Sequence, residues 1–312
     1  MRQKGVARRD MQRILVTGAR GFIGRYAVRE YAKTCYVIGI GHGHWDKNEY
    51  QNWGLSEWHE ADVTMESLQD YAQQIDTIIH CAGSGSVGFS IENPMLDFER
   101  TVWTTHYILE YIRLYSPKTK LIYLSSAAVY GNAHNMPIGE NTPLKPISPY
   151  GVHKKIVEEL CRMYNRTYGV KILIARLFSV YGDGLCKQLL WDACNKLSQG
   201  QNLFWGTGKE SRDFVHVTDV AKALVMMNSK VKNDLQIVNV ASGKAVPIFE
   251  LLSELFNAYG VIDKPCFGGQ INQGNPMHYW ADVKKINSWD WYPEKNLSDG
   301  IAEYVRWFKQ NA

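Results

Sequence analysis

The stretch from Arg13 to Gly24, Arg-Ile-Leu-Val-Thr-Gly-Ala-Arg-Gly-Phe-Ile-Gly, decides the fold of this chain. Its first five residues contain the apolar run Ile-Leu-Val and predict a short buried strand, and a helical pattern begins at Ile23. Gly18, Gly21 and Gly24 let the turn be tight and let the backbone amides at the helix start approach a pyrophosphate closely. A plain strand-to-helix turn is the alternative. The favoured prediction is a dinucleotide-binding turn, whose other members are Arg20, Phe22 and Ile23.

Apolar runs alternate with amphipathic stretches through the first half of the chain. The predicted strands cover residues 13–17, 36–40, 77–80, 120–124 and 170–175, and the main helical patterns cover 23–33, 97–114 and 154–168. This alternation is typical of a parallel sheet that helices cover on both faces. The sequence therefore predicts an α/β fold with a doubly wound parallel sheet of the Rossmann type.

The amino-acid composition changes after about residue 180, where glycines and aromatic residues become frequent. We expect residues 1–10 to be a disordered extension and 11–180 to be the dinucleotide-binding Rossmann domain. Residues 181–312 are expected to be mostly a smaller C-terminal substrate-binding lobe, with 212–242 returning to the Rossmann domain. Because open α/β sheets bind ligands beyond the carboxyl ends of their strands, we expect the substrate between the two lobes.

The composition is ordinary for a soluble globular protein, with 45% hydrophobic and 21% charged residues. A formal net charge of +4 is too small to indicate a nucleic-acid partner. No run approaches the roughly 20 apolar residues that a membrane-spanning helix needs, so no membrane association is expected. The six cysteines include no C-x-x-C pair, which favours buried free thiols in a reducing cytoplasm and indicates no metal site.

A tyrosine and a lysine lie four positions apart in Tyr150-Gly-Val-His-Lys154, downstream of Ser125-Ser126. On a helix the two side chains share one face. A lysine ammonium beside a phenol favours the phenolate, so we expect the pKa of Tyr150 to fall toward neutrality. Tyr150 could then exchange a proton with an alcohol oxygen while a nicotinamide exchanges a hydride with carbon. A solvated surface pair is the alternative, but Ser126 at a strand end favours a catalytic pair.

Five motifs together resemble those of the extended short-chain dehydrogenase/reductase family, in its nucleotide-sugar branch of epimerases, dehydratases and reductases. The resemblance covers nearly the whole chain. The motifs are TGARGFIG at 17–24, LSSAAVYG at 124–131, SPYGVHK at 148–154, ARLFSVYG at 175–182 and RDFVHVTD at 212–219. In combination they are highly specific for this family.

The resemblance implies a catalytic set of Ser126 as hydroxyl partner, Tyr150 as acid/base and Lys154 as its electrostatic partner. It also implies cofactor contacts beyond the glycine turn, with Asp62 near the adenine. The remaining implied cofactor contacts are His42, Val63, Cys81, Ala82, Gly83, Tyr150 and Lys154.

The resemblance places four residues at the substrate: Ser126, Ser179, Arg212 and Asn272. Arg212 would contact the substrate diphosphate, a role that suits a guanidinium fork. The stretch from Phe204 to Gly208 would border the nucleotide base.

Two departures from the family pattern bear on the reaction. Dehydratases of the family carry an acidic pair directly after the catalytic serine or threonine, whereas this chain has Ala127-Ala128, and alanine cannot transfer a proton. NAD-using members usually carry an acid at the end of the second strand, which binds the ribose 2′-hydroxyl. Here Gly41-His42-Gly-His44 has none. The two alanines therefore argue against a 4,6-dehydratase, and the missing acid favours NADP over NAD; NAD bound through other contacts is the alternative.

Three further departures concern the substrate. Ser179 stands where asparagine is commoner in the family, Thr101 replaces another common asparagine, and Asn272 stands where 4-epimerases tend to have a diphosphate-binding arginine. These differences argue against a standard UDP-galactose epimerase and leave both the sugar and the nucleotide open.

The leading functional prediction is an NADPH-dependent reductase of the 4-keto group of a nucleotide-linked 4-keto-6-deoxy sugar. An NAD-dependent nucleotide-sugar 4-epimerase is the alternative, because the same three residues serve both reactions. A non-catalytic dinucleotide-binding protein is a distant third, since this chain keeps both Tyr150 and Lys154. We also expect a cytoplasmic homodimer that pairs through the helices at 97–114 and 154–168, as many relatives do.

Overall fold

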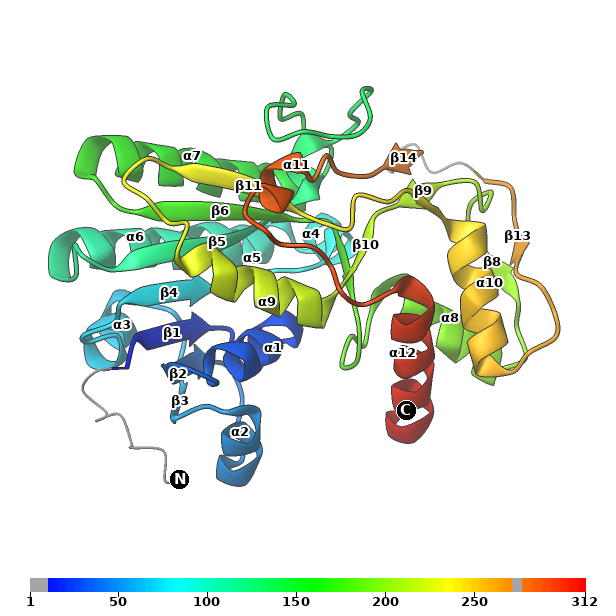
Figure 1. The fold of residues 1–312 in the computed structure, drawn as a ribbon, viewed down its shortest axis with the longest axis horizontal. Coiled ribbons are helices and arrows are strands. Elements are labelled where there is room, and N and C mark those ends of the chain that lie inside the picture. Colours follow the sequence, from blue (N-terminus) through cyan, green and yellow to red (C-terminus); the bar gives the residue numbers. More distant parts are fainter. Residues whose placement is uncertain (1–10, 271–276) are drawn as a thin grey trace. The chain divides into compact units, whose positions relative to one another are not determined.

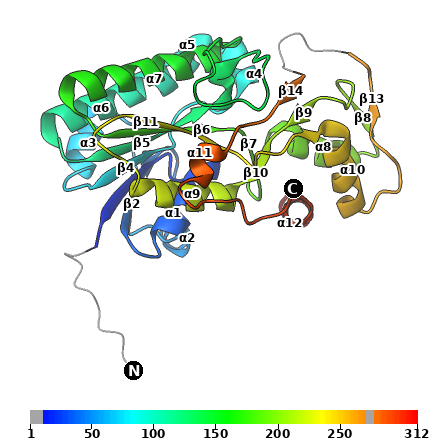
Figure 2. The ribbon, with the colours of Figure 1, turned by 45° about the horizontal axis from the view of Figure 1, so that its top comes forward.

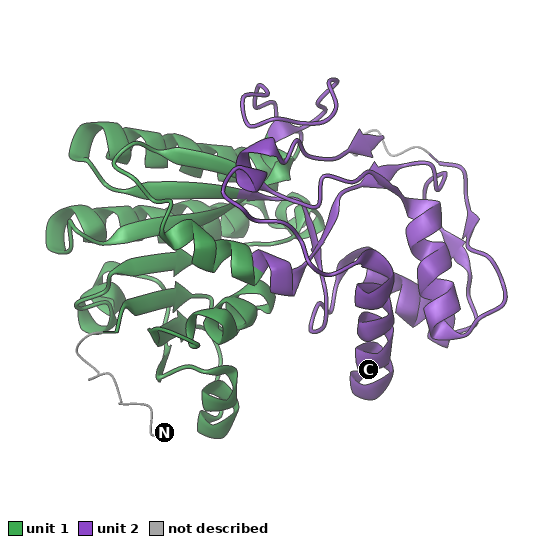
Figure 3. Ribbon diagram, in the orientation of Figure 1, with its two compact units in different colours: residues 1–129, 148–175, 221–238 green, residues 130–147, 176–220, 239–312 purple. Residues whose placement is uncertain are grey.

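The computed structural model describes residues 11–270 and 277–312. The chain divides into two compact units, coloured separately in Figure 3. Unit 1 contains the described residues up to 129, together with 148–175 and 221–238. Unit 2 contains residues 130–147, 176–220 and those from 239 onward. Each unit is therefore assembled from three separate segments of the chain.

A seven-stranded sheet forms the centre of unit 1, in the order β11-β6-β5-β4-β1-β2-β3. The pairs β2–β3, β1–β2, β1–β4 and β4–β5 are all parallel. The strands are β1 (Arg13–Thr17), β2 (Tyr36–Gly41), β3 (Glu57–Glu60), β4 (Thr77–His80), β5 (Lys120–Ser126), β6 (Ile172–Leu177) and β11 (Gln236–Val240). This topology confirms the predicted doubly wound α/β fold.

Helices cover both faces of this sheet (Figures 1 and 2). On one face, α3 (Met65–Tyr71), α6 (Thr104–Tyr115) and α7 (Pro149–Tyr168) pack their apolar side chains against Leu15, Ile78 and Leu121 of the strands. On the other face lie α1 (Phe22–Tyr31) and α9 (Val217–Asn228), which are joined by a 2.7 Å hydrogen bond from the Tyr31 hydroxyl to the Leu224 carbonyl oxygen. Alternate strand residues thus reach two apolar layers, as a doubly covered sheet requires.

Three shorter elements of unit 1 lead from β4 to α6. They are α4 (Val87–Glu92), α5 (Pro94–Phe98) and a π-helical turn, η1 (Glu99–Trp103). Every residue of the helical pattern predicted over 97–114 is helical, although the π turn divides the stretch into three elements. The remaining helices of unit 1 are α2 (Lys47–Trp53) and, at the boundary after β5, the 3-10 turn η2 (Ala127–Tyr130).

Local sequence signals explain both ends of α7. The Ser148 side chain accepts a hydrogen bond from the Gly151 amide, and Pro149 occupies the first helical turn. Both choices are favourable at a helix N-terminus, where amides lack backbone partners. Gly169 ends the helix with φ at 70°, a left-handed conformation that suits glycine. These signals fix where Tyr150 and Lys154 stand in the first turns of α7.

Unit 2 is built from helices and very short strands. The helices are α8 (Gln188–Ser198), α10 (Ile248–Tyr259), α11 (Lys284–Asn287) and α12 (Leu297–Asn311). The strands are β7 (Ser179–Tyr181) with β10 (Phe214–His216), β9 (Ser211–Arg212) with β12 (Val246–Pro247) and β14 (His278–Tyr279), and β8 (Leu203–Phe204) with β13 (Cys266–Phe267). Trp191 of α8 packs edge-on against Phe308 of α12, 5.1 Å between ring centres, in the apolar interior of this unit.

All six cysteines are free. Cys161 and Cys194 are buried as expected, but Cys186 and Cys266 are exposed, because they lie in loop and edge segments rather than on packed faces. None of the described helices is long and apolar enough to cross a membrane.

Candidate functional site

The strand order of the large sheet reverses between β1 and β4. From β1 the chain builds outward through β2 and β3, and from β4 it builds in the other direction. Open α/β sheets bind ligands at such a point, beyond the carboxyl ends of the strands. Gly18 follows β1 and Cys81 follows β4, and the Cys81 amide donates a 3.1 Å hydrogen bond to the Thr17 carbonyl oxygen. The glycine turn and the segment Cys81-Ala82-Gly83 therefore meet at the switch point.

Two glycines of this turn leave no room for a side chain. A Cβ at Gly18, where φ is 67°, would lie 2.8 Å from the Ala82 backbone nitrogen. A Cβ at Gly24 would lie 2.1 Å from the Gly18 carbonyl oxygen. Both are closer than real Cβ atoms come to other atoms, so helix α1 can pack this tightly on the turn only because these residues are glycines.

The N-terminus of α1 is open to an anion. Its N-cap residue, Gly21, makes no side-chain hydrogen bond to the first turn, and that turn contains no acidic side chain. Amides at a helix start that lack an acceptor, together with the helix dipole, favour a phosphate group. The first-turn amides of Phe22 and Ile23, and the tight glycine turn beside them, therefore fit the pyrophosphate of a dinucleotide.

A buried chain of hydrogen bonds links β1, β4 and α6 at the switch point. The Thr105 hydroxyl donates to the Thr101 carbonyl oxygen at 2.7 Å, so it accepts the Nε2–H of His80 at 3.0 Å. Nδ1 of His80 then accepts from the Thr17 hydroxyl at 2.7 Å, and that oxygen accepts the Ala82 amide at 3.3 Å. Burial lowers the pKa of His80 to about 3, so the ring is neutral, as this directed chain requires. Sequence reasoning did not identify His80, whose pairing depends on residues from three elements.

The ends of β2 and β3 bring together the residues expected near the adenosine. Nδ1 of His42 and a carboxylate oxygen of Asp62 form a 3.1 Å ion pair when the ring is protonated, and both side chains are largely exposed. The guanidinium of Arg20 lies against Gly43, where a Cβ would be 2.5 Å from Nη1. Val63 is buried beneath this surface.

Ser126, Tyr150 and Lys154 come together within unit 1. The Tyr150 phenol is hydrogen-bonded to the Ser126 side chain. The Lys154 ammonium is 5.9 Å from the centre of the Tyr150 ring, and it donates a 2.8 Å hydrogen bond to the carbonyl oxygen of Leu124 on β5. The Tyr150 amide donates to the Ser90 hydroxyl of α4 at 3.0 Å. Strand β5 and helix α7 thus fix the positions of the three side chains relative to one another.

Burial shapes the electrostatics of this trio. It raises the pKa of Tyr150 above its usual value, with a smaller lowering effect from the Ser126 hydrogen bond and a raising effect from Asp97. The expected fall toward neutrality is therefore absent in the protein alone, because desolvation of the buried phenol disfavours the phenolate. Burial also lowers the pKa of Lys154 to about 8, against the raising effects of Asp97, Cys81 and Glu158.

The 3-10 turn after Ser126 begins with Ala127-Ala128, and the Ala128 amide donates to the Ser126 hydroxyl at 3.2 Å. This hydrogen bond orients the serine hydroxyl. The turn brings no carboxylate to the position directly after the serine.

Two other expected substrate residues, Ser179 and Arg212, lie in unit 2. Arg212 lies on β9 and donates from Nη1 to the Ser211 carbonyl oxygen at 2.8 Å, and the Ser179 amide donates to the Asp213 carbonyl oxygen at 2.9 Å. The buried carboxylate of Asp213 accepts hydrogen bonds from Ser242, Gly243 and Ala281. These bonds fix the backbone between β9 and β10.

The stretch expected near the base begins with a buried residue, Phe204, followed by Trp205, whose side chain is 73% exposed. Asn272 lies outside the described residues.

Comparison with known proteins gives a consistent result. The NAD dependent epimerase/dehydratase family matches residues 14–241. The chain is 33% identical over 311 residues to a putative UDP-glucose 4-epimerase of Methanocaldococcus jannaschii, a match that covers 96% of this chain and 99% of that protein. A solved UDP-glucuronic acid 4-epimerase of Bacillus cereus, in complex with UDP-glucuronic acid and NAD, superimposes with a TM-score of 0.86 at 26% identity, over 96% of this chain and 100% of that one.

A dTDP-glucose 4,6-dehydratase, DesIV of Streptomyces venezuelae, superimposes with a TM-score of 0.87 at 24% identity, over 96% of this chain and 98% of that one. This likeness shows the fold alone, which epimerases and dehydratases share. The match across most of the chain and the near full-length relative establish that the chain belongs to the NAD dependent epimerase/dehydratase family of nucleotide-sugar enzymes, a branch of the extended short-chain dehydrogenases/reductases.

Proposed function

We propose that the protein is a 4-epimerase of UDP-linked hexoses, with Tyr150 as its acid/base residue. The observation that carries this proposal is the Tyr150 phenol, hydrogen-bonded to Ser126 and one helical turn from the buried ammonium of Lys154. This trio lies where β5 ends, and β5 is the neighbour of β4 at the switch point. Proton transfer at an alcohol oxygen is the chemistry that such a trio can perform.

The relatives favour epimerisation over the reductase that the sequence analysis placed first. The relatives from M. jannaschii and B. cereus are both named as 4-epimerases of UDP-sugars, which supports the function that the sequence analysis placed second. Dehydration would need a proton-transferring side chain after Ser126, where this chain has two alanines.

We assign NAD as the cofactor, held by the glycine turn, the first-turn amides of α1 and the segment 81–83. When bound, it supplies a reversible acceptor for the hydride of the sugar C4. The NADP preference expected from the missing acid after β2 has no support among the relatives, and the B. cereus structure contains NAD. Asp62, paired with His42, brings a carboxylate to this end of the sheet and would repel a 2′-phosphate.

The protein's own residues would move the proton and hold the sugar. Tyr150 would take the proton of the 4-hydroxyl as C4 is oxidised and return it when C4 is reduced on the opposite face. The Ser126 hydroxyl would donate a hydrogen bond to the same oxygen. Lys154, with a pKa of about 8, would be mostly charged at neutral pH and would stabilise the Tyr150 phenolate. We retain Ser179 and Arg212 of unit 2, with Asn272, as substrate-binding residues.

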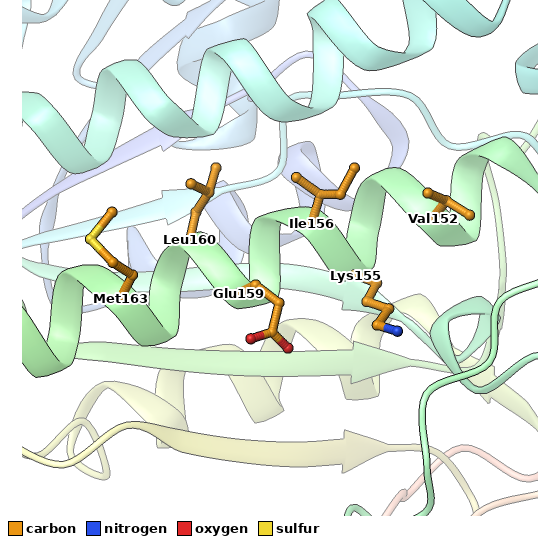
Figure 4. Close-up of a pocket in the computed structure, with 6 residues that line it drawn as sticks. All are labelled: Val152, Lys155, Ile156, Glu159, Leu160 and Met163. Carbon is orange, nitrogen blue, oxygen red and sulfur yellow. The ribbon is translucent and has the colours of Figure 1, made fainter.

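We also propose that the protein acts as a homodimer. Helix α7 packs one face on the sheet, yet its opposite face is apolar as well, with exposed fractions of 40% at Val152, 36% at Ile156 and 38% at Met163. Figure 4 shows this face, a shallow pocket lined by Val152, Lys155, Ile156, Glu159, Leu160 and Met163. The neighbouring α6 ends in the exposed Leu114 and Tyr115. A second copy packed through the same two helices would cover this surface.

The test is to incubate the purified protein with UDP-glucose, UDP-galactose, UDP-glucuronic acid and UDP-N-acetylglucosamine and to follow the sugars by proton NMR. We expect interconversion at C4 with no net consumption of cofactor, and NAD released from the denatured protein. A parallel sample contains NADPH and dTDP-4-keto-6-deoxyglucose. Stoichiometric oxidation of NADPH there, without epimerisation of any UDP-sugar, would replace the epimerase with the reductase.

A further inference from the structure

A buried contact between a carboxylate and a histidine involves the residue next to Lys154 of the proposed catalytic trio. Asp97 on α5 has a fully buried side chain, and its Oδ2 contacts Nδ1 of His153 on α7. His153 is the residue before Lys154, and its ring also meets the edge of Phe98, with 5.2 Å between ring centres. The same α4–α5 segment contacts α7 a second time, where the Ser90 hydroxyl accepts the Tyr150 amide. Both contacts fall within the first turns of α7, which carry the acid/base residue.

A carboxylate buried this completely needs compensation by positive charge or hydrogen bonds. Among the residues that the structure describes, Oδ1 of Asp97 has no hydrogen-bond partner. One side of the carboxylate is thus held by His153, while the other keeps its lone pairs free inside the protein. Such a group projects a strong field on its neighbours, because little water is present to screen it.

This field stabilises the charged form of the neighbouring Lys154. Lys154 is 5% exposed, and its ammonium donates a hydrogen bond to one neutral oxygen, that of Leu124. The ionisable groups that face it come from four elements: Asp97 on α5, Tyr150 and Glu158 on α7, Tyr123 on β5, and His80 and Cys81 at the end of β4. Neutral His80 and the buried thiol of Cys81 add little charge at neutral pH, since burial raises the pKa of Cys81 to about 12.

Two carboxylates, those of Asp97 and Glu158, are therefore candidates for the negative charge that balances the Lys154 ammonium. Glu158 is already engaged, because it accepts a 2.7 Å hydrogen bond from the Ser125 hydroxyl and lies 3.8 Å from the Arg162 guanidinium. Asp97 contacts no arginine among the ion pairs found in the described residues, and among the charges that raise the pKa of Lys154 its effect is the largest. The same charge raises the pKa of Tyr150.

We propose that Asp97 is a positioning residue of this active site: held by His153, its carboxylate keeps Lys154 in the ammonium form and thereby sets the pH range in which Tyr150 works. This inference rests on the proposed role of Tyr150 and Lys154 as a pair. It adds Asp97 of α5 to the residues that set the properties of the active site.

The sign of the effect follows from the charge. Without the Asp97 carboxylate, the pKa of Lys154 falls, so the ammonium is lost at lower pH and activity declines earlier on the alkaline side. The pKa of Tyr150 falls as well, so the phenolate forms at lower pH and the acid side also moves down. Asp97→Asn, which preserves shape, should therefore shift the whole profile of kcat/KM to lower pH, by on the order of one unit.

The experiment compares Asp97→Asn with Glu158→Gln, a matched removal of a buried carboxylate from the same surroundings. One measurement is the pH profile of kcat/KM. The other is the titration of the 13Cε resonance of Lys154 in protein without substrate, assigned by its absence in Lys154→Met. We expect Asp97→Asn to lower the Lys154 midpoint by about one pH unit and Glu158→Gln to lower it by less than half as much. Equal shifts in the two variants, or an unmoved midpoint in a folded Asp97→Asn protein, would overturn the proposal.

Because Asp97→Asn alters a contact between α5 and α7, a second variant tests the same inference with that contact rebuilt. In Asp97→Asn/His153→Asn two amides can replace the hydrogen bond while the carboxylate and the imidazole are both removed. It should show the same downward shift of the Lys154 midpoint, and an unmoved midpoint would again overturn the proposal. The NMR titration needs no turnover, so its outcome stands even if the protein proves not to be an epimerase.

Discussion

The Lys154 ammonium donates a 2.8 Å hydrogen bond to the Leu124 carbonyl oxygen, two residues before Ser126 on the same strand. This bond ties the start of α7 to the end of β5. The two proposed partners of Tyr150 thus come from a packed helix and a central strand, and neither depends on a loop for its position. A site built on rigid elements keeps its geometry more precisely than one built on loops.

Tyr150→Phe should lower turnover strongly while the protein stays folded. Phenylalanine cannot carry the proton, and loss of an acid/base group lowers kcat by roughly 10²–10⁴-fold. Tyr123→Phe is the matched control, because its buried hydroxyl has no hydrogen-bond partner within the described part of the chain. Steady-state kinetics and circular dichroism of both variants check this, and normal turnover in Tyr150→Phe would show that the assigned mechanism is wrong.

The buried Lys154 should make stability depend on alkaline pH. Its pKa is about 8 in the folded protein against 10.5 for an unperturbed lysine, so between these values the unfolded chain binds the additional proton. The free energy of unfolding then rises with pH across this window. Relative to Lys154→Met, the wild type should gain up to about 3 kcal/mol from pH 8 to pH 10.5. Urea unfolding of both proteins at several pH values measures the gap; a constant gap would contradict the prediction.

Gly24→Ala should destabilise the protein and empty the cofactor site. The added methyl group would lie 2.1 Å from the Gly18 carbonyl oxygen, so α1 must move away from the turn. Overpacking of this kind costs roughly 1–3 kcal/mol. Gly139→Ala is the control, since a Cβ there meets no atom within 4 Å. Urea unfolding and the amount of NAD that copurifies report the two effects; full NAD content in Gly24→Ala would argue against cofactor binding at this turn.

Ile156→Glu should convert the proposed dimer into a monomer. The charge would fall in the middle of the apolar face of α7, where contact with a second copy would desolvate the carboxylate at a cost in free energy. Ile262→Glu is the control, because the Ile262 side chain is fully exposed and far along the chain from α7. Size-exclusion chromatography with light scattering at micromolar concentration gives the mass. A wild-type monomer would exclude the dimer, and an Ile156→Glu dimer would exclude this surface.

The sequence predicted those parts whose signals are local. The strand at 13–17 has the apolar run Ile14–Val16 at its centre, and all but its first residue are buried in the structure. Backbone contacts at positions 18 and 24 leave room only for glycine. The spacing of the glycines therefore predicts the tight turn. Tyr150 and Lys154 follow the capping signals Ser148 and Pro149, so their helical register was also predictable.

What the sequence could not reveal depends on distant partners. Strand β3 reads Glu-Trp-His-Glu and has no apolar run, because it lies at the edge of the sheet and is only partly buried. The pairing of Asp97 with His153 joins residues 56 positions apart and arises only when α5 packs on α7. The raised pKa of Tyr150 has the same origin, since desolvation is a property of the folded environment and not of the motif.

The threefold segmentation of each unit has a consequence for synthesis on the ribosome. The chain visits unit 2 at residues 130–147 and 176–220 before the last segment of unit 1, at 221–238, has been made. Strand β11, which completes one edge of the sheet, ends only at residue 240 of 312. Until then β6 presents an unpaired edge, the kind of surface on which nascent chains associate wrongly. Neither unit can be expressed as one continuous fragment, and an exchange of unit 2 between relatives must replace three segments at once.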